Sequence, residues 1–580
     1  MVQASALDLA AIGLPDAWGG WDAWTVLDTD FRDGQRFLNL WRAWQRDPRR
    51  PRLLHYVGIA SVAPHMDVHE GVPDCSVPPH NAQALADQLP DRGPGFHRIL
   101  LSQAQVSLTL CIGDAQALLS EHVFQADTLL CVTTADKWAA QLLARRCKRG
   151  TRFWMDTTSQ NRTPVASKIA QPVLLQAAGF ELDSTTSPLN ALCGTFNPRW
   201  DIRTSRTPSQ HVVHTPGRCA VIGAGIAGAS IAHAMALRGW QVTVIDQEAA
   251  PAAGASGLPA GLAVPHVSAD DNPRSRLSRN GTRLLMQHAD HLLVRGQDWE
   301  PSGVLERRPD GGALWHPQAC WIKPAALVKA WLASPGVTFV GNTKIAALTA
   351  YSGGWTLGDP MGQDLGTYAV VVVANAMGCA ALMQGLESAH LTEPNLRDKV
   401  AALQPIHGTL SYGTYAEVLP GLPVHPVNGN GCFIPHVPSA TGEQWLAGST
   451  FEPDALVASD LKAQHVANME RLRQLLPVDG FDLADTLDRG PVGQWSATRC
   501  VTHDRLPLVG PIETTSGSGL WLCVGMGARG LSFSALCAEL LVARLGAEPL
   551  PVEFSLSGSL DANRAQRLRL FAADPSPAGD

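Results

Sequence analysis

The stretch CAVIGAGIAGASIAHAMALRGWQVTVIDQE, residues 219–248, decides the fold of the larger part of the chain. It predicts a short apolar strand, a glycine-rich turn, a helix of small residues and a second strand. Gly223 permits the tight turn, Gly225 lets the backbone approach a pyrophosphate, and Gly228 lets the helix pack closely on the strand. Asp246 ends the second strand, where a carboxylate can bond a ribose hydroxyl. This pattern predicts a dinucleotide-binding fold with phosphates at the helix amino terminus.

Two further segments favour a flavin over a nicotinamide. Residues 251–268, PAAGASGLPAGLAVPHVS, are small enough for the backbone to approach a flat ligand. Residues 519–541, GLWLCVGMGARGLSFSALCAELL, repeat the order strand, glycine-rich turn, helix. A second helix amino terminus would stabilise negative charge on a reduced flavin, so FAD is the expected cofactor. The expected cofactor-binding residues are Gly223, Gly225, Gly228, Asp246, Gly254, Ser256, Gly527 and Gly530.

Length and composition limit the remaining possibilities. A chain of 580 residues with 45% hydrophobic and 17% charged residues predicts two or more folded domains. The net charge of −7 argues against a protein coated by nucleic acid, but it permits a local basic patch. The 12 cysteines are scattered without a CxxC pair, which predicts buried thiols and no metal site. The first residues lack a basic signal-like region and no apolar run could span a bilayer, so we expect a cytoplasmic protein without membrane contact.

The order of predicted elements indicates an α/β protein with two parts. We expect a Rossmann-like domain over residues 1–196, a linker over 197–218 and a second domain over 219–570. Within the second domain, FAD-binding segments at about 219–270 and 500–550 are interleaved with an antiparallel substrate domain, which includes an amphipathic helix at 465–477. Residues 571–580 have the composition of a frayed tail.

Several motifs carry a family resemblance. VIGAGIAGAS, GASG, VVVVANAMG (370–378), DRLPLVGP (504–511) and GMGARGLSFSA resemble the D-amino-acid oxidase and glycine oxidase group. With an α/β domain in front, the whole chain resembles the MnmC family of bifunctional tRNA 5-methylaminomethyl-2-thiouridine biosynthesis proteins. The resemblance implies that the carboxy-terminal half uses FAD to remove a carboxymethyl group from a wobble uridine of tRNA. It also implies that the amino-terminal half, a methyltransferase fold, methylates the exposed amine with S-adenosylmethionine.

The amino-terminal half departs from that pattern. DTDFRDGQRFL (28–38) stands where the family has the form ELGFGTGLNFL, so Asp30 and Arg32 replace glycines. Ala60 stands where the family has a ribose-binding acid, and of the family's catalytic segment only Trp138 is matched. We predict that this half keeps its fold but neither binds S-adenosylmethionine nor methylates; a rearranged site is the alternative. The positions of this degenerate site are Asp28, Asp30, Arg32, Gly34, Ala60 and Asp114.

The substrate carboxylate of an oxidase of this kind calls for a cation near the flavin. Arg529, in the second glycine-rich turn, is the first candidate, ahead of Arg499, Arg505 and Lys323. His407 stands where the family has an arginine and is a second candidate catalytic residue, as an acid or base.

Two other functions are compatible with these residues. One is a small-molecule amine or amino-acid oxidase, and the other is a non-catalytic FAD-containing protein that binds tRNA. Basic clusters at 46–52 and 145–149, with Arg199, Arg203 and Arg206, could neutralise tRNA phosphates or simply be solvated.

Overall fold

The computed structural model describes most of the chain as two compact units. Unit 1 is Met1–His214 with Ala543–Ser557, and unit 2 is Thr215–Val542 with Gly558–Asp580. The described residues are 7–64, 79–89, 92–132, 137–157, 165–183, 191–201, 215–386, 394–415, 422–453, 460–476, 483–512, 514 and 518–564. Arg203 and Arg206 of the expected linker lie outside these ranges.

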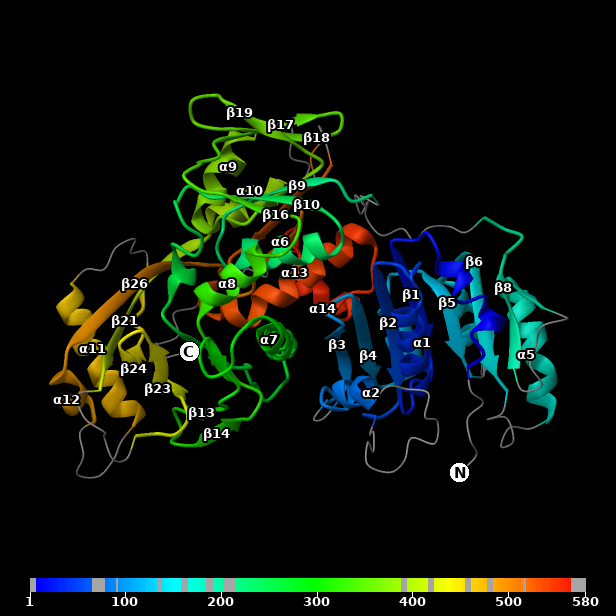
Figure 1. Ribbon diagram of the computed structural model, residues 1–580, viewed down its shortest axis with the longest axis horizontal. Coiled ribbons are helices and arrows are strands. Elements are labelled where there is room, and N and C mark those ends of the chain that lie inside the picture. Colours follow the sequence, from blue (N-terminus) through cyan, green and yellow to red (C-terminus); the bar gives the residue numbers. More distant parts are fainter. Residues whose placement is uncertain are drawn as a thin grey trace. The chain divides into compact units, whose positions relative to one another are not determined.

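Unit 1 is built on an eight-stranded sheet in the order β3-β4-β2-β1-β5-β6-β8-β7 (Figure 1). The strands are β1 (Ala23–Asp28), β2 (Leu53–Ala60), β3 (Gly95–Leu101), β4 (Val106–Ile112), β5 (Ala126–Cys131), β6 (Cys147–Asp156), β7 (Phe180–Leu182) and β8 (Ala191–Phe196). β4, β2, β1, β5 and β6 are parallel, whereas β3 and β8 join them antiparallel. The order reverses at β1, so a ligand crevice is expected at the carboxyl ends of β1 and β5.

Helices cover both faces of this sheet. They are α1 (Gln35–Arg46), α2 (Pro79–Ala86), α3 (Ala115–Ser120), α4 (Lys137–Ala144) and α5 (Val165–Ala177). One core gathers Phe37 and Trp41 of α1 against Tyr56 of β2, and a second core lies on the other face around Phe153. Because both faces are covered, every residue of β2 is buried, as expected for a parallel strand. The predicted Rossmann-like fold is confirmed.

The segment Ala543–Ser557, which includes α14 (Phe554–Ser557), belongs to unit 1, although the sequence suggested the second domain for it. Glu553 Oε1 accepts a hydrogen bond of 3.2 Å from the backbone N–H of Phe96. Arg98 is buried and donates to the Pro549 carbonyl and, at 2.9 Å, to the hydroxyl of Ser107. Buried charged groups need such partners, so this segment completes the sheet's β3–β4 end.

Unit 2 contains a six-stranded sheet in the order β16-β10-β9-β20-β28-β27 (Figure 1). Its strands are β9 (Arg218–Ile222), β10 (Gln241–Ile245), β16 (Val337–Val340), β20 (Val370–Val373), β27 (Leu508–Pro511) and β28 (Leu520–Val524). All pairings are parallel except that of β27 with β28. The strand order reverses at β9. The carboxyl end of β9 is followed by the glycine-rich fingerprint, residues 223–228.

The second large sheet of unit 2 is mainly antiparallel, as predicted for the substrate domain. It runs β14-β13-β22-β23-β24-β21-β25, and β26 pairs with β21. Its strands are β13 (Val304–Arg307), β14 (Ala313–His316), β21 (Gln404–Thr414), β22 (Val427–Gly429), β23 (Gly431–Ser439), β24 (Gly442–Gly448), β25 (Glu452–Pro453) and β26 (Val492–Val501). Two three-stranded sheets comprise β11 (Gly261–Ala263), β12 (Trp299–Glu300) and β15 (Cys320–Ile322), and β17 (Ala347–Tyr351), β18 (Gly354–Gly358) and β19 (Asp364–Tyr368).

The helices of unit 2 connect and cover these sheets. They are α6 (Ile226–Leu237), α7 (Pro273–Leu292), α8 (Pro324–Leu332), α9 (Cys379–Gly385), α10 (Pro394–Ala401), α11 (Leu461–Leu475), α12 (Leu483–Asp488) and α13 (Gly530–Gly546). α11 is the predicted amphipathic helix, and it begins earlier than predicted because the side chain of Asp460 caps it by accepting from the Lys462 N–H at 3.0 Å.

The crossing of α7 and α13 gives a first prediction. A Cβ added at Gly281 would lie 1.7 Å from the carbonyl oxygen of Ser532, in the first turn of α13. We expect Gly281→Ala to lower the free energy of unfolding by about 1–3 kcal/mol or more, since overpacked contacts cost that much. Thermal unfolding followed by circular dichroism measures the loss. Asn280→Ala on the same helix is the control, and equal melting temperatures for the two variants would contradict the packing argument.

Candidate functional site

The fingerprint of unit 2 has a turn that excludes side chains at two glycines. Gly223 has a φ of +107°, and a Cβ there would lie 2.7 Å from the carbonyl oxygen of Ala374, which follows β20. A Cβ at Gly228 would lie 1.9 Å from the carbonyl oxygen of Gly223. The start of α6 therefore packs directly on the turn after β9, as a phosphate-binding turn requires.

The amino terminus of α6 is held by two side chains that the sequence singled out. Ser256, in the short helix η4 (Ala255–Gly257), accepts from the Ile226 N–H at 2.9 Å. Asp246, directly after β10, accepts from the Ala224 N–H at 2.6 Å and from the Glu248 N–H at 2.9 Å. The carboxylate thus fixes the turn from the ribose side of the expected cofactor.

The second glycine-rich turn meets the same helix terminus. Gly527 lies in η7 (Gly527–Arg529), and a Cβ added at Gly530 would lie 3.5 Å from Cγ2 of Ile226, the first residue of α6. A Cβ at Gly254 would meet no atom within 4 Å, and one at Gly225 would meet only Ser256 Oγ, at 3.3 Å. The structure therefore gathers the predicted cofactor residues around one helix terminus and leaves room beside its backbone. These residues fit FAD.

One face of the antiparallel sheet is directed toward this region. Trp495 of β26 approaches η4, because a Cβ at Gly257 would lie 3.8 Å from its Nε1. The pairing of β26 with β21 is regular from Gln404 to Gly413, so side chains alternate between the two faces without a break. Arg499, two alternations beyond Trp495, therefore lies on the same face.

Arg499 is a desolvated cation. Burial lowers the pKa of its guanidinium, and the group donates to the Ser449 hydroxyl. It makes no ion pair with a carboxylate within the described part of the chain. A Cβ at Gly408 would lie 2.7 Å from Nη2 of Arg499 and 2.9 Å from the carbonyl oxygen of Thr450, so a side chain there would crowd the guanidinium. Arg471 of α11 donates to the Ser449 carbonyl and fixes the same residue from the other side.

His407 lies on the opposite face of the sheet. His407 and Ser411 are four residues apart in β21, so their side chains lie on the same face of the strand. On that face the hydroxyl of Ser411 accepts a hydrogen bond of 3.1 Å from Asn468 of α11. His407 Nδ1 lies 3.2 Å from the hydroxyl of Thr498, and His407 is 5% exposed. The structure therefore separates His407 from Trp495. The role of His407 in catalysis stays a prediction that this arrangement does not favour.

The other candidate cations occupy different positions. Arg529 is half-buried in η7, next to the bridge between Val501 of β26 and Met526. Lys323 is the residue before α8, and Arg505 has a φ of +59° in the turn before β27. From the sequence, the alternation of side chains along β26 could have favoured Arg499 as the substrate-binding cation. This would have required knowing which face of the sheet α11 covers.

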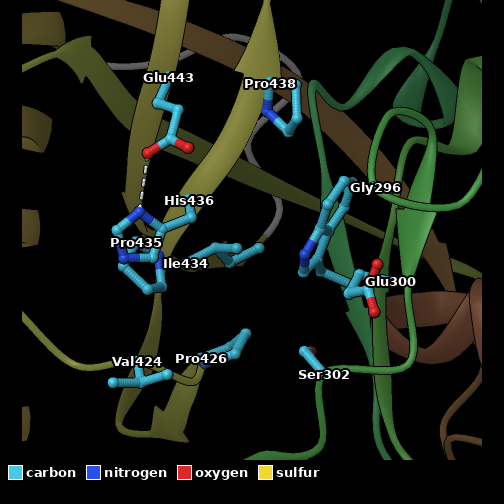
Figure 2. Close-up of a pocket in the computed structure, with 11 residues that line it drawn as sticks. Gly296, Glu300, Ser302, Val424, Pro426, Ile434, Pro435, His436, Pro438 and Glu443 are labelled. Atoms are coloured by element: carbon cyan, nitrogen blue, oxygen red, sulfur yellow. Dashed lines mark hydrogen bonds and ion pairs between the residues drawn. The ribbon is translucent and has the colours of Figure 1, made fainter.

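A cavity of about 230 Å³ opens beside the same apolar cluster as Trp495. Ile434 and Trp321 belong to both the cluster and the cavity wall, and none of the predicted site residues lines it. Figure 2 shows His436 and Glu443 at one side, joined by a contact of 2.9 Å between Nδ1 and Oε2.

The corresponding crevice of unit 1 is filled by its own side chains. Asp28, at the end of β1, is fully buried and accepts from Arg36 Nη1 at 2.7 Å and from the Tyr56 hydroxyl at 2.7 Å. Burial raises the pKa of the Asp28 carboxyl, and the opposing effects of Arg36 and Tyr56 do not offset it. Asp30 forms ion pairs with both Arg32 and Arg36, with 3.6 Å between Asp30 Oδ2 and Arg36 Nη2. The carboxylate and guanidinium groups of this loop therefore pair with one another, although Arg36 Nη2 has no hydrogen-bond partner among the described residues.

The aromatic ring of Phe31 closes the rest of the loop. It is 2% exposed, and a Cβ at Gly58 of β2 would lie 2.4 Å from its Cδ2. Gly34 has a φ of +76° directly before α1. Ala60 contributes only its carbonyl, which accepts from the Gly113 N–H at 2.9 Å, and exposed Asp114 caps α3 by accepting from the Ala117 N–H at 2.9 Å. These residues do not fit S-adenosylmethionine as the family's glycine-rich loop would.

Comparisons with known proteins identify the family. The model of the FAD dependent oxidoreductase family matches residues 218–306 and 285–544. A tRNA 5-methylaminomethyl-2-thiouridine biosynthesis bifunctional protein MnmC from Albidiferax ferrireducens is 42% identical over 99% of this chain and 98% of its own length. The chain belongs to the MnmC family. The MnmC protein of Ralstonia nicotianae is 30% identical, over 97% of this chain and 93% of the relative.

The MnmC relatives and the FAD dependent oxidoreductase model confirm the expected family and the expected FAD cofactor. The solved glycine oxidase of Geobacillus kaustophilus covers 60% of this chain and 99% of its own, with a TM-score of 0.49 and 18% identity.

The described ranges contain no group of three or more His, Cys, Asp or Glu side chains suited to a metal ion. In the same ranges, no helix combines the length and apolarity needed to cross a membrane. Cys432 is half-buried, and the other cysteines that the structure describes are buried and form no disulfide.

Gly228 tests the fit of FAD. In Gly228→Ala the new Cβ would collide with the Gly223 carbonyl, 1.9 Å away, and would push α6 from the turn. We expect the purified variant to carry at least about tenfold less flavin per protein, a loss of roughly 1.4 kcal/mol or more in binding. Gly217→Ala is the control, because its Cβ would meet its neighbours at 3.9 Å or more. Full flavin content in Gly228→Ala would contradict the proposed binding turn.

Arg36 tests the internal ion pairs of unit 1. Arg36→Met leaves the Asp28 carboxylate buried without its cation, which costs about 3–5 kcal/mol of folding free energy. Because burial already raises the pKa of Asp28, the folded state keeps this proton at pH values at which the unfolded chain has lost it. The free energy of unfolding therefore falls as the pH rises from the unfolded pKa through the folded pKa. The loss in Arg36→Met should therefore grow from acid to neutral pH in denaturant unfolding.

The matched control lies in the same loop. Arg32 is partly exposed and pairs with Asp30 at the surface, so Arg32→Met should cost at most about 1 kcal/mol. An equal, pH-independent effect of the two substitutions would show that the Asp28–Arg36 pair does not hold the loop.

Proposed function

We propose that this protein is an FAD-dependent oxidoreductase of tRNA wobble-uridine modification. Its substrate is 5-carboxymethylaminomethyl-(2-thio)uridine in tRNA, and its product is the 5-aminomethyl form. Membership of the MnmC family supports the tRNA substrate, because the relatives are named for that biosynthesis. The observation that supports the oxidation step most directly is the position of Arg499. Its guanidinium is desolvated and lies on the sheet face that approaches the FAD fingerprint.

Arg499 suits the carboxylate of the departing carboxymethyl group. A guanidinium that is already desolvated and not committed to a protein carboxylate gains most from a bidentate partner. Ser449 and Gly408 fix its position, one by a hydrogen bond and the other by leaving space. Trp495 supplies a flat apolar surface on the same face of the sheet. Together these residues would orient the carbon beside the secondary amine.

FAD supplies the two-electron acceptor that turns the C–N single bond into an imine, which water cleaves to glyoxylate and the primary amine. The protein contributes binding and electrostatics. The amino terminus of α6 and the Asp246 carboxylate would hold the pyrophosphate and the ribose. The second turn, with Gly527, Arg529 and Gly530, brings a second helix terminus and a cation to the same place.

We propose further that unit 1 does not methylate the product. Its crevice at the end of β1 is occupied by the Phe31 ring and by the ion pairs of Asp28 and Asp30 with Arg36. Binding S-adenosylmethionine there would require displacing a buried ring and breaking buried ion pairs, each costly on its own.

Arg499 gives the test of the oxidative half. We expect Arg499→Met to keep its FAD but to lose about 100-fold or more in kcat/KM, since removing one member of a buried charge pair costs 2–5 kcal/mol or so. Stopped-flow reduction of the flavin by carboxymethylaminomethyl-bearing tRNA measures this. Arg499→Lys should recover part of the loss because it keeps the charge.

His407→Gln is the control from the opposite sheet face and should stay within about threefold of the unsubstituted protein, as substitutions away from the substrate do. Undiminished reduction in Arg499→Met would exclude this carboxylate site. Reduction by glycine or sarcosine but not by modified tRNA would instead indicate the small-molecule oxidase.

A further inference from the structure

We propose that the unit 1 sheet binds unpaired nucleotides and phosphates of the tRNA substrate at the edge where its parallel strands begin. The proposal rests on the proposed function, because it takes tRNA as the ligand. We call this surface the tryptophan–arginine edge. Its residues are Trp21, Arg49, Arg50, Arg52, Arg145, Lys148, Arg149 and Trp200.

The topology brings these distant residues together. The amino ends of parallel strands meet at one edge of a sheet, so Arg52, before β2, lies beside Trp21, before β1. The Leu53 N–H donates to the Asp22 carbonyl at 3.0 Å, which fixes that neighbourhood. β6 begins at the same edge with Cys147, and the antiparallel β8 ends there, just before Trp200. Figure 1 shows β2, β1, β5, β6 and β8 side by side.

The tryptophans of this edge are exposed although they are large and apolar. Trp21 is 57% and Trp200 51% exposed, whereas Trp44 and Trp154 of the same unit are almost fully buried. An exposed indole forfeits the burial that would stabilise the fold, by about 1.5–3 kcal/mol for a large side chain. A group of such residues on one edge therefore indicates a binding surface.

Each exposed tryptophan has a cation beside it. Lys148 Nζ lies 5.3 Å from the centre of the Trp21 ring. Arg149 donates to the Trp200 carbonyl at 3.3 Å and so fixes the backbone that carries this indole. The Trp21 ring therefore has a cation beside it and the backbone at Trp200 is fixed, while both indoles stay exposed.

Carboxylates compensate part of the charge of the edge, since the pKa of Asp47 is lowered by its hydrogen bond from Trp18 and also by the charges of Arg49 and Arg50. Arg50, Arg52, Arg145 and Arg149 form no ion pair with a carboxylate among the residues that the structure describes. Arg49 pairs with exposed Asp16 at 2.6 Å, and Lys148 pairs with buried Asp127. A positive edge on a chain with a net charge of −7 indicates an anionic partner.

Exposed aromatic rings between arginines fit unpaired nucleotides better than an apolar protein face. Bases stack on tryptophan regardless of sequence, and neighbouring guanidinium groups pair with phosphates. An apolar partner would have to bury these guanidinium groups without a counter-charge, which is costly. The edge lies opposite the filled crevice, so RNA binding does not require the methyltransferase site.

The test measures binding of a tRNA transcript to the FAD-loaded full chain. We expect the double variant Trp21→Ala/Trp200→Ala to bind about tenfold or more weakly, because each stacked base contributes about 1–3 kcal/mol. Arg50→Gln/Arg52→Gln should reduce the slope of log K against log salt by about 1–2, as expected for two lost phosphate contacts. The controls are Trp315→Ala, a 44% exposed tryptophan of unit 2, and Arg308→Gln, an exposed arginine of unit 2.

Flavin reduction by modified tRNA separates this proposal from the proposed function. The edge variants should raise KM about as much as they weaken binding and leave the rate at saturating tRNA unchanged, since they lie outside the oxidase. Unchanged tRNA affinity in both double variants would overturn the proposal, even if the unsubstituted protein oxidises tRNA. So would a change of oligomeric state in light scattering with unchanged tRNA affinity, which would indicate a protein interface. Weakened binding together with a flavin that tRNA never reduces would support the edge and reject the oxidase activity.

Discussion

The close contact between α6 and the turn after β9 is the constraint on which unit 2 depends. Only glycine fits at position 228, because a Cβ would lie 1.9 Å from the Gly223 carbonyl. This contact sets the helix terminus at the point where the strand order reverses, and doubly wound folds bind ligands there. Ser256, Asp246 and the turn before α13 then pack around that terminus, although they come from distant parts of the chain. The antiparallel sheet adds Arg499 on the face that approaches it.

In unit 1 the strand order also reverses, at β1, but there the crevice at the carboxyl end of the strand is filled by side chains. At the end of β1, Asp30 and Arg32 stand where the family's loop has glycines, and their side chains form an ion pair with each other. The Phe31 ring covers Gly58, and the buried Asp28 is held by Arg36. One crevice leaves its backbone accessible, whereas the other is filled by the Phe31 ring and by the ion pairs of Arg36. This contrast is the basis for our proposal that unit 1 keeps its fold without a cofactor site.

The sequence was most informative where one local pattern decides the structure. The strands of unit 1 and the fingerprint of unit 2 follow from apolar runs and fixed glycine spacing, and the structure confirms both. The sequence was less informative about Arg499 and His407, because alternation along a strand does not tell which face α11 covers. Nor could local patterns show that Ala543–Ser557 returns to unit 1, or that Trp21 and Trp200 meet at one sheet edge. These arrangements depend on long-range pairing.

We propose a working oxidase joined to a unit that keeps the methyltransferase fold without its cofactor. The most direct measurement incubates the FAD-loaded protein with carboxymethylaminomethyl-bearing tRNA, with and without S-adenosylmethionine, and identifies the nucleosides by mass spectrometry. The structure leads us to expect the aminomethyl nucleoside in both samples, at equal yield. Conversion to the methylaminomethyl nucleoside on addition of S-adenosylmethionine would contradict this account, because it would require a cofactor site in unit 1.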